Sequence, residues 1–160
     1  MSRKLVAYFS VTGITARVAE RLSETIGADI YSIEPEVPYT RKDVEWRNPR
    51  SRSALEQKDV SFRPEIEEKR DNMDEYDTVY VGFPIWMNMA PTIINTFLES
   101  YDMTGKRIIT FTVFDCNDME TINRMLLPSC QGAELITGGI IKPDSGVAEL
   151  SEWVSGIETD

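Results

Sequence analysis

Three hydroxyl side chains gather around one glycine near the amino terminus of this chain of 160 residues. The segment SVTGIT, residues 10 to 15, follows an apolar run and precedes a stretch with helical spacing, and its hydroxyls belong to Ser10, Thr12 and Thr15. A helix start presents backbone N–H groups without intrahelical partners, and its dipole favours an anion. The segment therefore predicts a neutral, donor-rich cradle for a phosphate dianion. Alternatively, the same hydroxyls could serve only as helix caps.

Several other chemistries are excluded by residue types that the chain lacks. It contains no histidine, which excludes Ser-His-Asp and Cys-His catalysis and imidazole metal sites. Its two cysteines, Cys116 and Cys130, lack the spacing of a zinc site, and we expect them to be reduced thiols. The SVTGIT segment has neither a Walker lysine nor a G-x-G-x-x-G pattern. Demanding chemistry must therefore come from a bound cofactor.

Size and composition predict one globular domain over residues 1–160. The chain is 41% hydrophobic and 28% charged, which is typical of a soluble protein with a single core. The first apolar run leads into a glycine turn and lacks a small-residue cleavage site, so it reads as a strand and not as a signal peptide. We therefore expect a cytoplasmic protein.

The charge of the chain is acidic overall and locally basic. A net charge of -10 argues against a nucleic-acid partner, which needs a basic footprint, and would attract a basic protein instead. Residues 41 to 70 nevertheless hold 9 of the 17 Lys and Arg. This segment is either an ordinary solvated loop or a site for an anionic ligand.

Apolar strand-like runs alternate with amphipathic helical patterns along the chain. The runs lie at residues 4–10, 28–35, 77–84, 106–114 and 133–141, and the helical patterns at 15–26, 90–101, 119–127 and 147–157. Residues 36–74 lose this periodicity, although 53–58 could form a short helix. Such alternation predicts an α/β fold, a parallel sheet with helices on both faces. For five strands in the order 2-1-3-4-5, a ligand site forms from the loops after the first, third and fourth strands.

The segment LVAYFSVTGIT resembles the FMN phosphate loop of the flavodoxin family, with its hydroxyl-x-Thr-Gly-x-Thr pattern. The similarity to one bacterial flavodoxin-like subfamily extends over roughly residues 4 to 136. It is carried by GADIYSIEPEVPYT, the SRS and RP stretches, YDTVYVGFPIW, APTIINTFLESYDMTGK and LPSCQGA. The resemblance implies a three-layer flavodoxin-like fold that binds one FMN.

The resemblance also implies which residues bind the cofactor, in three loops. The phosphate loop comprises Ser10, Thr12, Gly13, Ile14 and Thr15. The loop that wraps the isoalloxazine comprises Pro84, Ile85, Trp86, Met87 and Asn88. The third loop comprises Thr112, Val113, Phe114, Asp115 and Cys116. Relatives usually carry small residues in this third loop, often Ser-Gly-Gly, so the chain departs from the family pattern there.

Three functions are compatible with this pattern. The first is an electron carrier that serves a redox partner protein. The second is an FMN-dependent NAD(P)H:quinone-type oxidoreductase acting on a small-molecule acceptor, in which Arg47, Arg50 and Arg52 would hold an anionic nucleotide. The third is a flavin-free module, because the altered third loop could have lost the ring site. Cys116 could also face the flavin as a redox-active thiol. We expect neither a nucleic acid nor a membrane as partner.

Overall fold

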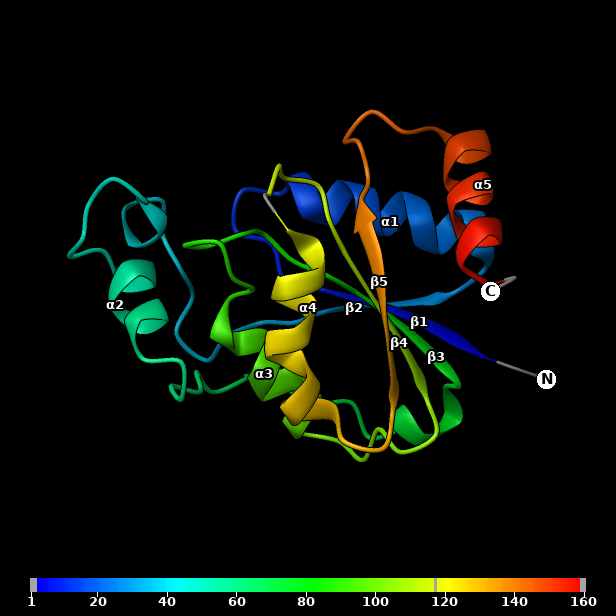
Figure 1. The fold of residues 1–160 in the computed structure, drawn as a ribbon, viewed down its shortest axis with the longest axis horizontal. Coiled ribbons are helices and arrows are strands. Elements are labelled where there is room, and N and C mark those ends of the chain that lie inside the picture. Colours follow the sequence, from blue (N-terminus) through cyan, green and yellow to red (C-terminus); the bar gives the residue numbers. More distant parts are fainter. Residues whose placement is uncertain (1–2, 117, 159–160) are drawn as a thin grey trace.

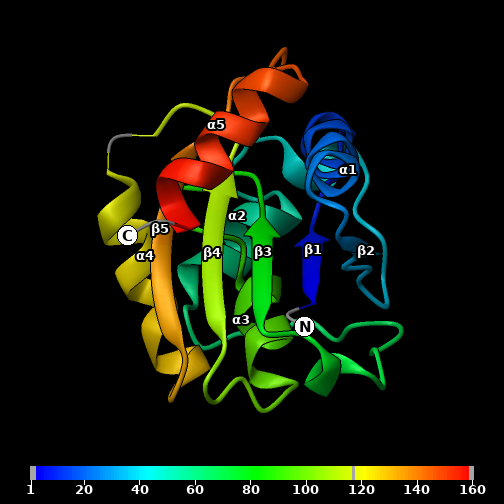
Figure 2. The ribbon, with the colours of Figure 1, turned by 90° about the vertical axis from the view of Figure 1, so that its right-hand side faces the viewer.

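A computed structural model describes residues 3–116 and 118–158 and shows a parallel sheet between two layers of helices (Figures 1 and 2). The five strands have the order β2-β1-β3-β4-β5, and every neighbouring pair is parallel. In Figure 2 the strand arrows point to the same edge of the sheet, where the loops after β1, β3 and β4 emerge. The predicted fold class and strand order are confirmed.

The elements follow one another in the predicted alternation. The strands are β1 (Lys4–Tyr8), β2 (Asp29–Ser32), β3 (Thr78–Gly82), β4 (Arg107–Thr112) and β5 (Glu134–Ile140). The α-helices are α1 (Ile14–Ile26), α2 (Arg52–Lys58), α3 (Thr92–Glu99), α4 (Met119–Leu126) and α5 (Val147–Glu158). Short 3-10 turns are η1 (Lys42–Val44), η2 (Met73–Glu75) and η3 (Leu127–Cys130). No helix within the described ranges is long and apolar enough to cross a membrane.

The sheet separates two hydrophobic cores, because successive strand residues point to opposite faces. On one face, Leu5 and Ala7 of β1 belong to the core built with α3 and α4. On the other face, Val6 packs with α1 and α5, in the core that also contains Tyr80 of β3. Both faces are thus covered, which explains why the central strands read as continuous apolar runs.

The boundaries of the elements differ from the predicted ones by a few residues. The first strand ends at Tyr8, two residues earlier than predicted, so Ser10 already belongs to the loop. The α-helix α4 ends at Leu126, before Pro128 as predicted, and the 3-10 turn η3 follows it with the proline in its first turn, where proline is tolerated. Val147, the first apolar residue of the predicted helical pattern 147–157, is 63% exposed because it stands in the first turn of α5. Leu150 and Val154, which share the apolar face of this pattern, are buried.

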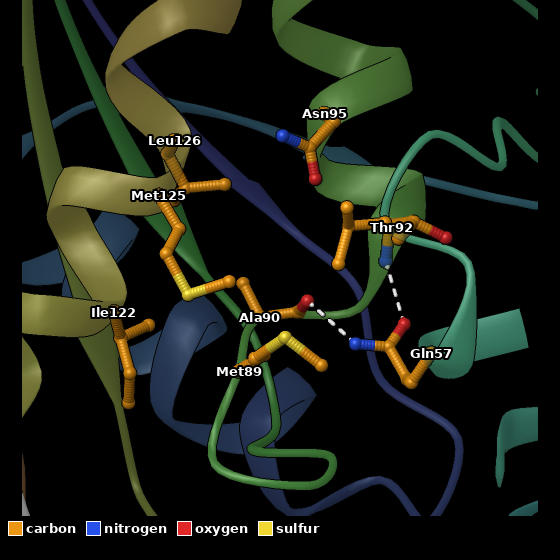
Figure 3. A pocket seen from close by; sticks show the side chains of 9 residues that line it. Gln57, Met89, Ala90, Thr92, Asn95, Ile122, Met125 and Leu126 are labelled. Carbon is orange, nitrogen blue, oxygen red and sulfur yellow. Dashed lines mark hydrogen bonds between the residues drawn. The ribbon is translucent and has the colours of Figure 1, made fainter.

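The connection between β2 and β3, residues 33–77, folds against the body of the protein through side chains. Within the connection itself, an isolated antiparallel backbone bridge joins Pro35 to Ile66. Gln57 of α2 is buried, and its amide donates to the Ala90 carbonyl (3.1 Å) and accepts from the Thr92 N–H (3.0 Å). Figure 3 shows this pair of hydrogen bonds beside a small cavity between α3 and α4. Gln57 thereby ties the connection to the first turn of α3.

Candidate functional site

A cavity of about 360 Å³ lies at the carboxyl edge of the sheet, where the three predicted loops meet. Its volume is within the range of small-molecule sites. The loops after β1, β3 and β4 all contribute to its wall, and so does the connection between β2 and β3. The lining residues are Ser10, Val11, Thr12, Thr15, Val44, Trp46, Pro84, Ile85, Trp86 and Phe114.

The first loop brings hydroxyls to an uncapped helix end. Gly13 has φ 94°, a left-handed conformation that favours glycine, and it places Ile14 as the first residue of α1. The Ser10 hydroxyl accepts a hydrogen bond from the Gly13 N–H (3.1 Å), which tightens the turn, but no side chain caps α1. The first turn also carries no acidic residue. The hydroxyls are therefore not used as helix caps, and the positive end of α1 is available to an anion.

The second loop holds Trp86 in a fixed position. Trp86 and Met89 exchange two backbone hydrogen bonds (2.9 and 3.0 Å) around a two-residue turn. Its central residues, Met87 (φ 52°) and Asn88 (φ 61°), have the positive φ of a type I′ turn, and both side chains are exposed. Trp86 packs edge-on against Phe9 and Tyr39, with ring centroids 5.5 and 5.2 Å away. Trp86 thus faces the cavity from a rigid aromatic cluster, whereas the turn itself points outward.

The third loop contributes one aromatic side chain to the cavity. Phe114 lines it, whereas Thr112 and Val113 are buried, and the Thr112 hydroxyl accepts from the Phe114 N–H (3.3 Å). Asp115 is exposed and is not part of the cavity wall. Asp118 caps α4 by accepting from the Thr121 N–H, as its position before the helix predicts. Asn117, which follows Cys116 in the sequence, lies outside the described residues.

Sequence reasoning missed the part of the wall that comes from elsewhere. Val11 lies inside the first loop, but Val44 and Trp46 belong to the connection between β2 and β3. Trp46 is 77% exposed although it is the largest kind of side chain. The one available signal was an isolated tryptophan in a polar segment, which pattern alone does not place in space.

Comparisons with known proteins agree with this architecture. A family model described as Flavodoxin matches residues 3–157. The chain belongs to the flavodoxin family. A candidate flavoprotein from Bacteroides eggerthii DSM 20697 is 37% identical, with a TM-score of 0.88 and 100% of each chain covered. A second candidate flavoprotein, from Bacteroides uniformis ATCC 8492, is also 37% identical, with a TM-score of 0.89. The match covers 96% of this chain and 98% of the Bacteroides uniformis chain.

A more distant flavodoxin-like structure is known with its ligand. The flavoprotein of Lactobacillus acidophilus NCFM, solved in complex with FMN, is 18% identical, with a TM-score of 0.71 over 96% of this chain and 99% of its own. At this identity the likeness shows a shared fold. No match was found among the curated proteins.

The thiols of Cys116 and Cys130 differ in their surroundings. The thiol of Cys116 is half-buried, and burial, followed by the nearby Asp115 and Asp118 carboxylates, raises its pKa. A raised pKa keeps the thiol protonated and unreactive. Cys130 is buried against α4, and both cysteines are free thiols.

The three arginines proposed for an anionic nucleotide have different surroundings. Arg52 stacks on the Tyr39 ring (3.7 Å to the centroid), pairs with Glu56 (2.8 Å) and donates to the Val37 and Pro38 carbonyls. Its guanidinium therefore stabilises the connection. Arg47 lies over the Trp46 ring (5.0 Å), and Arg50 is exposed on the same loop.

Proposed function

We propose that this flavodoxin-family chain binds FMN in the cavity at the carboxyl edge of the sheet and transfers electrons through it. One observation carries the proposal. Three hydroxyls at an uncapped helix start share a single cavity with the indole of Trp86 and the phenyl ring of Phe114. A ligand that combines a phosphate with a large flat ring matches this division into a polar end and an apolar end.

The residues at the polar end fit the phosphate of FMN. Ser10, Thr12 and Thr15 line the cavity, and among the described residues no side chain caps α1 after the Gly13 turn. Together they offer hydrogen-bond donors and a favourable helix dipole to a dianion. The absence of an acidic residue in the first turn removes the repulsion that an otherwise acidic protein would present.

The residues at the apolar end fit the isoalloxazine. Pro84, Ile85, Trp86 and Phe114 form apolar walls from two different strand-end loops. Because Phe9 and Tyr39 hold Trp86 in place, little side-chain freedom is lost when a ring packs against it. FMN, when bound, supplies the one- and two-electron chemistry that the side chains lack. The FMN complex of the Lactobacillus acidophilus flavoprotein, which shares the fold, supports this choice.

Electron transfer to a protein partner is the role that the charge favours. A net charge of -10 gives a field that attracts a basic redox partner and speeds encounter. The second candidate, an NAD(P)H-dependent oxidoreductase, is favoured by Arg47 and Arg50, which lie on the loop whose Trp46 lines the cavity. These arginines could pair with the phosphates of a nicotinamide nucleotide.

The visible spectrum of the purified protein, first with FMN and then with NADPH, separates these functions. A red shift or structured flavin band on addition of FMN is the expected result. A bound flavin that NADPH leaves oxidised identifies a carrier, whereas bleaching by NADPH and recovery with a quinone identifies an oxidoreductase. A spectrum of free FMN at saturating protein would contradict the proposal and leave a flavin-free module.

A further inference from the structure

Trp46 stands out because it is exposed yet lines the cavity. Its side chain belongs to the loop of residues 40–51, which follows none of the strands that supply the three predicted loops. The indole is 77% exposed, more than any other large hydrophobic residue in the described part of the chain. An exposed tryptophan at the rim of a cavity is typical of a binding surface.

The loop of residues 40–51 is held by its own hydrogen bonds. The Thr40 N–H donates to the Asp43 carboxylate (2.8 Å), and the Asp43 N–H donates back to the Thr40 hydroxyl (3.3 Å). Further along, the Asn48 N–H donates to the Glu45 carbonyl (3.1 Å) and the Ser51 N–H to the Asn48 carbonyl (3.0 Å). Consecutive turns of this kind define the position of Trp46, so its exposure is a property of an ordered loop.

Both ends of this loop are attached to the strand-end segment of residues 84–92, which carries part of the cavity wall. Before the loop, Tyr39 packs on Trp86 and Phe9. At its other end, Ser51 caps α2, and Gln57 of α2 bonds to the backbone of Ala90 and Thr92, which follow the second predicted loop. The loop is therefore positioned relative to the same strand-end segment that carries Trp86.

The surroundings of the indole leave room for one flat ligand. Arg47 lies over the Trp46 ring at 5.0 Å, and a cation on one side of the ring leaves the rest of the indole for other contacts. Val44 of the same loop also lines the cavity and extends the apolar surface. A cavity of about 360 Å³ accommodates a single ring system of flavin size, so a ligand held by the phosphate loop would meet Trp46 as well.

We propose that Trp46 is a flavin-binding residue, which gives the isoalloxazine an aromatic contact from the loop of residues 40–51 in addition to the three strand-end loops. This inference rests on the proposed binding of FMN. It assigns a function to the segment between β2 and β3. In this proposal the loop of residues 40–51 covers part of the isoalloxazine ring and limits the access of water to that ring.

The first test compares the affinities of FMN and riboflavin for wild type, Trp46→Ala, Trp46→Phe and a matched control, Phe62→Ala. Phe62 is a 39% exposed aromatic residue of the same connection that does not line the cavity. Trp46→Ala should weaken both flavins by about tenfold, which equals about 1.4 kcal/mol, because both contain the ring. Trp46→Phe should restore most of the affinity, and Phe62→Ala should bind like wild type.

The second test makes Trp46 the sole tryptophan, through Trp86→Phe and Trp153→Phe. Its fluorescence should be quenched on addition of FMN, with a blue shift as water leaves the indole. Wild-type affinities in Trp46→Ala, or unchanged emission at saturating FMN, would overturn the inference. Flavin absorbance is titrated in wild type and in the Trp86→Phe/Trp153→Phe protein, so a failure of FMN binding in either is recognised separately from the role of Trp46.

Discussion

The loops at the carboxyl edge of the sheet and the connection between β2 and β3 are positioned in different ways. Each strand-end loop follows a buried strand, so the sheet fixes where its first residues lie. The connection, residues 33–77, has backbone hydrogen bonds to the strand region at its two ends, and its middle part is fixed by individual side chains, with Tyr39 on Trp86 and Gln57 on the backbone around Pro91. Both nevertheless reach the same cavity, so one site combines a part built by the backbone with a part built by side-chain contacts.

The strongest test of the strand-end part removes the hydroxyls of the first loop. In Thr12→Ala/Thr15→Ala, two hydrogen bonds to a charged phosphate should be lost, at about 1.5 to 3 kcal/mol each. The affinity for FMN should fall by about 150-fold or more, whereas riboflavin, which has no phosphate, should bind almost as before. Isothermal titration of both flavins measures the difference. The control Thr12→Ser/Thr15→Ser keeps the hydroxyls and should keep the affinity, and equal losses for both flavins would show that the phosphate lies elsewhere.

The corresponding test of the connection removes its buried attachment. Gln57→Ala should leave the Thr92 N–H and the Ala90 carbonyl without partners in a buried region, which costs about 2 to 4 kcal/mol in the free energy of unfolding. Urea denaturation of the flavin-free protein measures this loss. Leu55→Ala, a truncation at a 54% exposed position of the same helix, should change stability little. A stability equal to wild type in Gln57→Ala would mean that the connection is attached by other contacts.

Two neighbouring arginines sharpen the comparison within the connection. Arg52→Ala should lower the free energy of unfolding by about 1 to 2 kcal/mol, because it removes the stack on Tyr39 and the hydrogen bonds to two carbonyls. Arg50→Ala, at an exposed position, should stay within about 0.5 kcal/mol of wild type. Thermal and urea unfolding of both variants measure the change in the free energy of unfolding. Similar changes for the two substitutions would refute the structural role of Arg52.

A smaller effect is expected at Asp115 in the third strand-end loop. Its carboxylate should oppose the negative charge that the flavin gains on reduction, so Asp115→Asn should raise the reduction potential. Because Asp115 is exposed, solvent screens this interaction, and we expect a shift of about 10 to 30 mV that decreases at high salt. Spectroscopic redox titration at two ionic strengths measures it. A reduction potential that Asp115→Asn leaves unchanged would show that solvent screens the Asp115 carboxylate from the flavin completely.

The smallest predicted effect concerns the pH dependence of Cys116. Because burial and two carboxylates raise its pKa, the thiolate should form only above the ordinary pH range of thiol ionisation. Alkylation by iodoacetamide should therefore increase with pH to a midpoint higher than that of a model thiol, and Asp115→Asn should lower this midpoint. A Cys130→Ser background isolates the Cys116 signal. A midpoint below the ordinary value would instead indicate an activated thiol.

The contrast between the two regions also explains what the sequence could predict. Periodicity placed α1, whose Val18 and Leu22 face the core, and Gly27 marked its end with a left-handed φ of 67°. The hydroxyls of Ser10 and Thr15 could be assigned to the cavity because strand order alone brings their loop there. Trp46 could not be assigned, because its position depends on contacts between segments far apart in sequence. The exposure of Val147 could not be predicted either, because a helical pattern does not reveal how far the helix extends beyond the sheet.

The hydrogen bonds of Gln57 have a consequence for how the protein opens. A single side chain of α2 bonds to the backbone on both sides of Pro91, so α2 and the segment that follows the Trp86 turn should separate from the body together. Native-state hydrogen exchange would then find them in one cooperative unit, with the Thr92 amide exchanging at the same opening free energy as the amides within α2.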